Sequence, residues 1–255
     1  MMRSSLALEV ESAFFASMPE RYREAFDATD AREHAAIVSR RGGAAAHLEI
    51  WRRIPDGGAI VCVVGDDRPG LLSFISAALL VHQMDVVAAK VFTRRAGAAT
   101  ATGGPEAVDF FWIRRDATLP MPVLRADILG IGDVLGALVA GELTVESIAR
   151  HSRALRPVPR GASTHVTFED GLEDGLTELT VRTFDRPGLL LSITHALFRA
   201  QVQIMESEAS TREGHVVDRF TIAELDGSPV SRQKRGVVQM EVLGAIDALT
   251  HGSLS

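Results

Sequence analysis

One hexapeptide occurs twice in this chain, and this repetition constrains the fold more than any other feature. The two copies read Asp-Arg-Pro-Gly-Leu-Leu and begin at Asp67 and Asp185, so the offset is 185 − 67 = 118 residues. A run of β-forming residues precedes each copy, and an amphipathic run follows it. An aspartate N-cap and a proline in the first turn are typical of a helix start, and the glycine allows backbone or ligand to come close. Each copy therefore predicts a strand, a tight turn and a helix.

The repetition extends well beyond the hexapeptide. The offset of 118 also aligns Thr93 with Thr211, whereas Asp109 aligns with Asp218 at an offset of 218 − 109 = 109. The difference places nine extra residues (118 − 109) in the loop 94–107 of the first copy. A repeat of this length indicates a duplicated structural unit.

The order of elements is the same in both copies. Strands are predicted at 48–54, 59–65, 85–93 and 108–114 and again at 164–169, 178–184, 204–211 and 216–223, with helices after Pro69, Leu124, Pro187 and Ser231. The resulting order is ββαββα. A ferredoxin-like unit is βαββαβ, and a leading strand in a hairpin can fill the place of its last strand. The fold class predicted is α+β: two ferredoxin-like repeats, each a four-stranded antiparallel sheet with two helices on one face and the edge strand moved to the start.

Residues 1–43 differ from both repeats. They contain short helical stretches separated by Met18-Pro19 and by residues 27–30, with Asp30 as the expected N-cap of the third. Large apolar residues are too few here for independent folding, so we expect this connector to pack on the first repeat. The domains predicted are 1–43, a helical connector; 44–159, the first repeat; and 160–255, the second repeat after the linker 156–160.

Composition excludes several classes of protein. The net charge is −6 without a basic block, so nucleic acid is not an expected partner. No apolar run reaches the roughly 20 residues of a membrane span, and no signal peptide is evident, so a cytoplasmic location is expected. The single cysteine, Cys62, is expected to be buried and excludes an internal disulfide. The eight histidines show no metal-ligand spacing, and no cofactor is expected.

The repeated motifs resemble a known family. A strand ending in Asp-Arg-Pro-Gly-Leu-Leu, a helix, a strand, a Thr-Arg hairpin and then Asp-x-Phe, as at Asp109 and Asp218, is similar to an ACT domain. The tandem arrangement over about residues 45–250 resembles the ACT pair at the C-terminus of bacterial PII uridylyltransferases, the uridylyl-removing enzymes. Residues 18–22 also resemble the connector that precedes those domains.

This resemblance implies a regulatory function in nitrogen metabolism. ACT pairs of that family sense glutamine, at the turn between the first strand and first helix, where two ACT units meet within a chain or in a homodimer. A helix N-terminus suits a carboxylate. The site residues implied are, in one turn, Asp67, Arg68, Gly70 and Leu71; in the other, Asp185, Arg186, Gly188 and Leu189; and, at the starts of the second strands, Asp85 and Gln203. Asp85 is a charged departure at its position, which favours the second turn.

The chain also departs from the family. It has no Gly-rich turn followed by Asp-x-Asp, and none of its histidines is followed by aspartate, so both catalytic motifs of the uridylyltransferase are absent and an enzyme is not predicted. The expected partners are a free amino acid and a PII-type protein or a separate enzyme. Two alternatives remain: an ACT-fold interaction module without ligand, and a non-catalytic remnant of a uridylyltransferase.

Simpler interpretations apply to several of these residues. The hexapeptide turn can be a helix start without a ligand. We expect His34 on the surface, Asp109 and Asp218 in structural roles at hairpins, and Arg94-Arg95 as solvated charges at a strand end.

Overall fold

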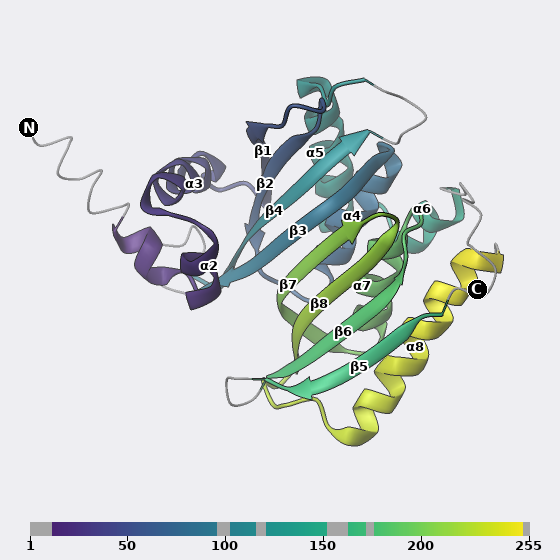
Figure 1. Cartoon of the computed structure of the whole chain (residues 1–255). Helices are drawn as coiled ribbons and strands as arrows, with labels where there is room; N and C mark the ends of the chain where they lie inside the picture. Colours follow the sequence, from purple (N-terminus) through teal and green to yellow (C-terminus); the bar gives the residue numbers. More distant parts are fainter. Residues whose placement is uncertain (1–11, 96–102, 116–120, 152–162, 172–175, 252–255) are drawn as a thin grey trace, which may run out of the picture.

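The computed structural model describes residues 12–95, 103–115, 121–151, 163–171 and 176–251. Its eight strands form one antiparallel sheet in the order β1-β2-β4-β3-β7-β8-β6-β5 (Figure 1). The strands are β1 Ala46–Arg53, β2 Ala59–Asp66, β3 Met84–Arg94, β4 Glu106–Arg115, β5 His165–Asp170, β6 Thr177–Phe184, β7 Val202–Arg212 and β8 His215–Glu224. We call β1–β4 with their helices the first repeat and β5–β8 with theirs the second repeat.

Both leading strands pair as predicted. β1 pairs with β2, and β5 with β6, each within its own hairpin. The α+β class and the ββαββα order are therefore confirmed, with one short helix added at the end of the first repeat. The linker 156–160, residues 96–102 of the long loop and residues 172–175 of the predicted turn lie outside the described residues.

The two repeats meet through β3 and β7. The register pairs Ala88 with Ser210, Lys90 with Glu208, and Phe92 with Glu206. Lys90 and Glu208 are themselves 118 positions apart, so equivalent residues face one another and the two repeats are related by a pseudo-twofold axis through this pair. Lys90 Nζ lies 3.1 Å from Glu208 Oε1.

The helices of both repeats cover one face of the sheet. They are α4 Leu71–Val81, α5 Arg125–Ala140 and α6 Val145–His151 in the first repeat, and α7 Leu189–Arg199 and α8 Arg232–His251 in the second. The apolar residues predicted to line α4, including Leu72, Ile75 and Leu79, are buried in one core that continues across both repeats. α4 packs against α7 beneath the β3–β7 joint. None of the described helices is long and apolar enough to cross a membrane.

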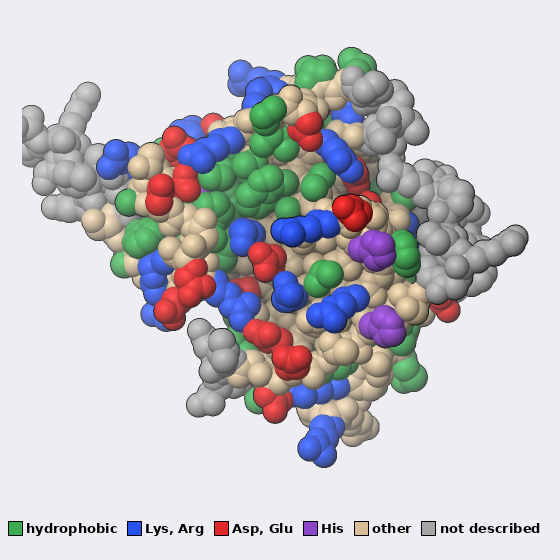
Figure 2. Space-filling view, viewed as in Figure 1, with side chains coloured by type: hydrophobic (Ala, Val, Ile, Leu, Met, Phe, Trp, Pro, Cys, Tyr) green, Lys and Arg blue, Asp and Glu red, His purple; other side chains and the backbone are tan. Residues whose placement is uncertain are grey.

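In the part of the chain that the structure describes, helices cover the opposite face of the sheet only over the first repeat. Here α2 (Glu20–Ala25) and α3 (Ala28–Arg41) pack on β1–β4 (Figure 1). Figure 2 shows the same side of the molecule, where acidic and basic side chains lie across the uncovered sheet of the second repeat. The α3 helix begins after Asp27, whose side chain accepts from the N–H groups of Thr29 and Asp30. The prediction of Asp30 as N-cap is therefore wrong, because the helix starts three residues earlier.

His34 lies inside the connector's aromatic cluster, so its predicted surface position is wrong. The side chain is fully buried among Phe26, Trp51 and Phe110. The Tyr22 hydroxyl lies 2.7 Å from His34 Nδ1. Burial, with a smaller contribution from the charge of Arg52, lowers the pKa of His34 to about 3.

Arg94 is also buried, contrary to the solvated position predicted for it. It joins a network in which Glu106, with no exposed surface, accepts from Arg94 at 2.9 Å and from Arg41 at 2.7 Å. Arg94 Nε also donates to Ser17 Oγ at 2.8 Å. The connector lies over this strand end and shields it from solvent. The network thereby links α3 and the segment before α2 to the ends of β3 and β4.

Candidate functional site

Each hexapeptide forms a tight turn directly before a helix. The helices begin at Leu71 and Leu189, and the residue before each is a glycine in the left-handed region, Gly70 with φ 86° and Gly188 with φ 77°. A side chain is strained in this conformation, so glycine is required. The predicted aspartate N-caps are wrong: neither helix has a side-chain N-cap hydrogen bond, because each aspartate lies three residues before the N-cap glycine.

Each turn faces the start of a strand from the other repeat. The N–H of Asp185 donates to Gly214 O at 2.8 Å, which holds the second turn at the β7–β8 hairpin. Since β7 runs antiparallel to β3, the end of β7 lies beside the start of β3, where Asp85 is located. The sequence placed Asp85 and Gln203 at equivalent positions; the structure places Asp85 with the second turn and Gln203 with the first.

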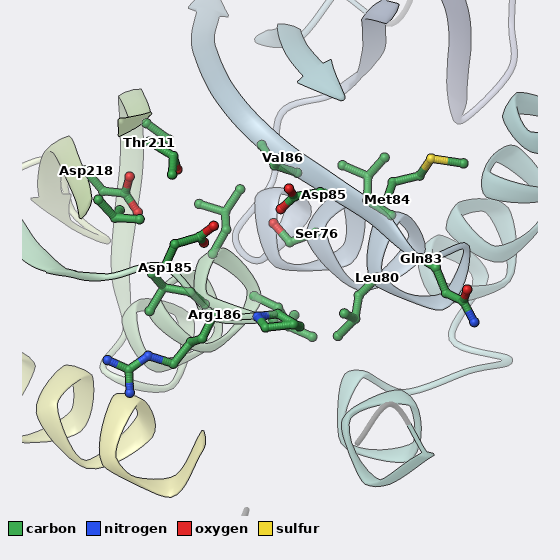
Figure 3. Close-up of a pocket in the computed structure, with 18 of the residues that line it drawn as sticks. Ser76, Leu80, Gln83, Met84, Asp85, Val86, Asp185, Arg186, Thr211 and Asp218 are labelled. Atoms are coloured by element: carbon green, nitrogen blue, oxygen red, sulfur yellow. The ribbon is translucent and has the colours of Figure 1, made fainter. Parts of the chain in front are cut away.

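The second turn opens into a cavity of about 400 Å³ between the two repeats. Figure 3 shows Asp85, Asp185 and Asp218 around this cavity, with Ser76 and Leu80 from α4 and Thr211 from β7. The predicted site residues Asp185, Arg186, Gly188 and Leu189 all line it, as does Asp85. A volume of this size falls in the range of roughly 300–1,000 Å³ typical of small-molecule sites.

Asp218 is a buried acid at the wall of this cavity. It is 2% exposed, and its Oδ1 has no hydrogen-bond partner among the described residues. The pKa of Asp218 is raised to about 7: burial is the largest cause, a backbone hydrogen bond from Ser210 opposes it, and the nearby charge of Asp185 adds a smaller increase. The carboxyl group therefore retains an unused acceptor at the cavity wall.

Asp85 is already paired from its own repeat. Arg114 on β4 donates to Asp85 Oδ2 through Nε at 3.0 Å and through a terminal nitrogen at 2.9 Å. The charge of Arg114 therefore compensates the carboxylate of Asp85, one of the three acidic side chains around the cavity.

The guanidinium groups of the two hexapeptide arginines are bonded within their own repeats. Arg68 donates to Val139 O at 2.9 Å near the end of α5. Arg186 donates to Thr183 Oγ1 at 2.9 Å and to Ile246 O of α8 at 3.4 Å, and Figure 3 shows its guanidinium group directed toward that helix. A cation suits the carbonyl groups near a helix C-terminus. Both arginines thus hold the turn against the second helix of its repeat.

The first turn lines a much smaller cavity, of about 30 Å³, together with Gln203 and Phe198. The predicted residues Asp67, Arg68, Gly70 and Leu71 all lie at its wall. Thr93 Oγ1 donates to Asp67 Oδ2 at 2.9 Å, and burial raises the pKa of Asp67. A cavity of this size holds on the order of one or two water molecules.

Asp109 and Asp218 lie within their strands, not at the predicted hairpins. Asp109 is paired with Val63 across the sheet, and Asp218 with Val181. Asp109 is 1% exposed and accepts from the Phe92 N–H at 3.3 Å, and burial raises its pKa well above the ordinary value. The recurrence of an aspartate inside two equivalent apolar strands was the sequence signal that could have placed both residues at the cavities.

The second cavity has the chemistry to hold a small zwitterion. Its acidic side chains can hold an ammonium group, and the N-terminus of α7 can receive a carboxylate, although the N–H of Leu189 already donates to Arg186 O at 3.1 Å. Among the described residues no group of three or more His, Cys, Asp and Glu side chains has the arrangement of a metal site.

Comparison with known proteins shows sequence similarity to bacterial uridylyltransferases. No family model matches the chain. It is 26% identical over 237 residues to the bifunctional uridylyltransferase/uridylyl-removing enzyme of Caulobacter vibrioides, covering 91% of this chain and 24% of that protein. The corresponding enzyme of Ruegeria pomeroyi is 30% identical over 171 residues, or 65% of this chain and 17% of that protein. The chain is similar to one region of these enzymes.

The similarity to uridylyltransferases is partial. The chain spans about a quarter or less of the length of the curated relatives it matches. The enzyme of Cereibacter sphaeroides, for example, is 28% identical over 176 residues, which are 18% of its length. A crystal structure of an unknown protein from Galdieria sulphuraria matches 76% of this chain at 17% identity with a TM-score of 0.20, which is too low to bear on the fold.

Proposed function

We propose that this chain is a non-catalytic, amino-acid-sensing regulatory module of the uridylyltransferase type, with L-glutamine as its leading ligand. The observation that supports it is the cavity of about 400 Å³ at the second turn, where a helix N-terminus and acidic side chains lie together. A cytoplasmic location and action on a PII-type protein or a partner enzyme are further parts of this proposal, supported by the similarity to uridylyltransferases.

The ligand's two charged ends have separate binding groups in this proposal. The carboxylate lies at the N-terminus of α7, beside Gly188, where the helix dipole contributes about 0.3–2 kcal/mol. The ammonium group lies near Asp185 and the unused oxygen of Asp218. A few such contacts suit an affinity between millimolar and high micromolar, roughly −4 to −6 kcal/mol.

A thermal-shift screen of the twenty amino acids, followed by calorimetric titration of L-glutamine, tests the proposal. Asp185→Ala should weaken binding by about 1–3 kcal/mol because a charged contact is lost. The matched control is Asp133→Ala, since Asp133 is an exposed aspartate on α5, away from the cavity. Gly188→Val is a less selective test, because φ is 77° at this position and any side chain is strained there.

Absence of binding would overturn the sensor proposal. If wild type shows neither a thermal shift nor heat with L-glutamine at tens of millimolar, roughly −2.4 kcal/mol or weaker, an ACT-fold interaction module takes its place. Equal affinities of wild type and Asp185→Ala would instead refute the placement of the ammonium group.

A further inference from the structure

The two cavities are built from equivalent positions on opposite sides of the pseudo-twofold axis. Each hexapeptide contributes one wall, and the opposite repeat contributes the other. Five positions of this second wall correspond at the offset of 118: Ser76 with Thr194, Leu80 with Phe198, Met84 with Val202, Asp85 with Gln203, and Val86 with Ile204. The duplication therefore supplies two sites of the same design.

The two sites nevertheless differ in volume by more than tenfold, about 400 Å³ against about 30 Å³. An amino acid fits the larger cavity, at the second turn, and does not fit the smaller cavity, at the first turn. The helix start is the same in both, since Gly70 and Gly188 have the same left-handed conformation. The helix start therefore does not account for the difference, whereas the side chains opposite the turn do differ.

Phe198 accounts for the loss of space at the first turn. A Cβ placed on Gly70 would lie 3.0 Å from Phe198 Cδ2, and the three atoms nearest to that point all belong to the Phe198 ring. At the second turn the equivalent contact is made by Leu80, whose Cδ2 would lie 3.4 Å from a Cβ on Gly188. An aromatic ring thus lies directly over one glycine, and a smaller aliphatic side chain stands over the other.

At other equivalent positions the larger side chain does not always lie in the smaller cavity. The first site has the larger residue at Val91, opposite Ala209 in the second site, but the smaller one at Ser73, opposite Leu191. These residues line the walls, whereas Phe198 supplies the nearest atoms over the glycine. The ring is the change that bears on the helix N-terminus itself.

We propose that Phe198 closes the first of two equivalent sites and that Leu80 keeps the second open. Resting on the proposed function, this means that each chain takes a single amino acid, at the turn containing Gly188. The selecting residue comes from the opposite repeat in each case: Leu80 lies on α4 and covers the second turn, and Phe198 lies on α7 and covers the first. The helix contact on the pseudo-twofold axis therefore determines how many ligands bind.

Calorimetric titration of L-glutamine into full-length variants measures the consequence. Wild type should bind one equivalent, Phe198→Leu should bind two, and Leu80→Phe should lose at least tenfold in affinity. The double exchange Leu80→Phe/Phe198→Leu should bind one equivalent again, with its affinity now sensitive to Asp67→Ala and no longer to Asp185→Ala. Unchanged affinity in Leu80→Phe, or one equivalent in Phe198→Leu with its thermal stability intact, would overturn the proposal.

A second measurement decides the closure without any ligand. Ser76 and Thr194 are equivalent residues of α4 and α7 that line the two cavities, and each hydroxyl donates to a carbonyl of its own helix. Ser76→Cys should react with a small methanethiosulfonate at least tenfold faster than Thr194→Cys, and adding Phe198→Leu should remove the difference. The native Cys62 is fully buried, and wild type serves as the blank.

The two measurements separate the proposals. If wild type does not bind L-glutamine, the glutamine sensor fails, and the labelling rates alone decide whether Phe198 closes the first site. If Ser76→Cys and Thr194→Cys react at equal rates, the closure is refuted even where glutamine binds.

Discussion

Replacing Arg41 by alanine removes the centre of the buried ion network beneath the connector. The guanidinium group donates to Glu106 Oε1 at 2.7 Å, to Asp66 Oδ1 at 2.6 Å and to Ala44 O at 2.8 Å. The side chain of Arg41 is 1% exposed, and that of Glu106 is 0% exposed. The variant therefore leaves a buried carboxylate with Arg94 as its remaining cation.

The expected loss is large because the pair is buried. Removal of one partner of a buried ion pair costs about 3–5 kcal/mol, and the retained contact with Arg94 places Arg41→Ala near the lower end, at about 3 kcal/mol. The adjacent residue provides a matched control. Arg40 donates to Glu49 at 2.8 Å, but these side chains are 50% and 36% exposed, so Arg40→Ala should cost about 0–1 kcal/mol.

Urea denaturation followed by tryptophan fluorescence measures both losses. Both tryptophans, Trp51 and Trp112, lie on strands of the first repeat and report on the part that the network stabilises. We expect the free energy of unfolding to fall about 3 kcal/mol for Arg41→Ala and less than about 1 kcal/mol for Arg40→Ala. Equal losses in the two variants would refute the reasoning from burial.

Two further predictions concern buried polar groups. The folded-state pKa of Asp218, about 7, lies above the unfolded value of about 3.9, so its ionisation costs stability progressively as pH rises from about 4 to 7. Asp218→Asn should therefore gain about 2–3 kcal/mol relative to wild type between pH 5 and pH 8 in urea denaturation, and a pH-independent difference would contradict this. Tyr22→Phe should cost about 1–3 kcal/mol in the same assay, because His34 Nδ1 loses the hydroxyl at 2.7 Å; a loss below about 0.5 kcal/mol would contradict it.

The helices and strands of this fold could be predicted because local residue patterns indicate them and because these patterns occur in both repeats. The run of β-forming residues at 60–64 and the helical spacing of Leu72, Ile75 and Leu79 need no knowledge of distant residues. The hairpins of the leading strands follow from turn residues such as those at 55–58. Repetition then confirmed each assignment in one copy by the other.

The failed predictions concern residues whose surroundings come from elsewhere in the chain. His34 was expected on the surface because its sequence neighbours are polar or small, yet Trp51 and Phe110 of the sheet enclose it. Arg94 was expected in solvent because it ends a strand, yet the connector covers that end. The start of α4 depends on the φ angle of Gly70, which a residue pattern does not report.

The candidate site shows the same division. The turns at Asp67 and Asp185 were found from sequence because they repeat, but the exchange of partners between repeats depends on how β3 and β7 dock. Two strands of 11 residues can meet in several registers, and the sequence does not single one out. The closure by Phe198 follows from that same docking.

The Lys90–Glu208 ion pair on the pseudo-twofold axis bears on how a protein with two similar repeats disfavours pairing of like repeats from separate molecules. Two copies of β3 from separate molecules, meeting in the observed register, would place Lys90 against Lys90; two copies of β7 would place Glu208 against Glu208. Like charges directly opposite each other on adjacent strands are destabilising. Only the pairing of one repeat with the other brings the ammonium group to the carboxylate at 3.1 Å. After duplication, the divergence of this one position favours the pairing of β3 with β7 over the pairing of two β3 strands or two β7 strands from separate molecules.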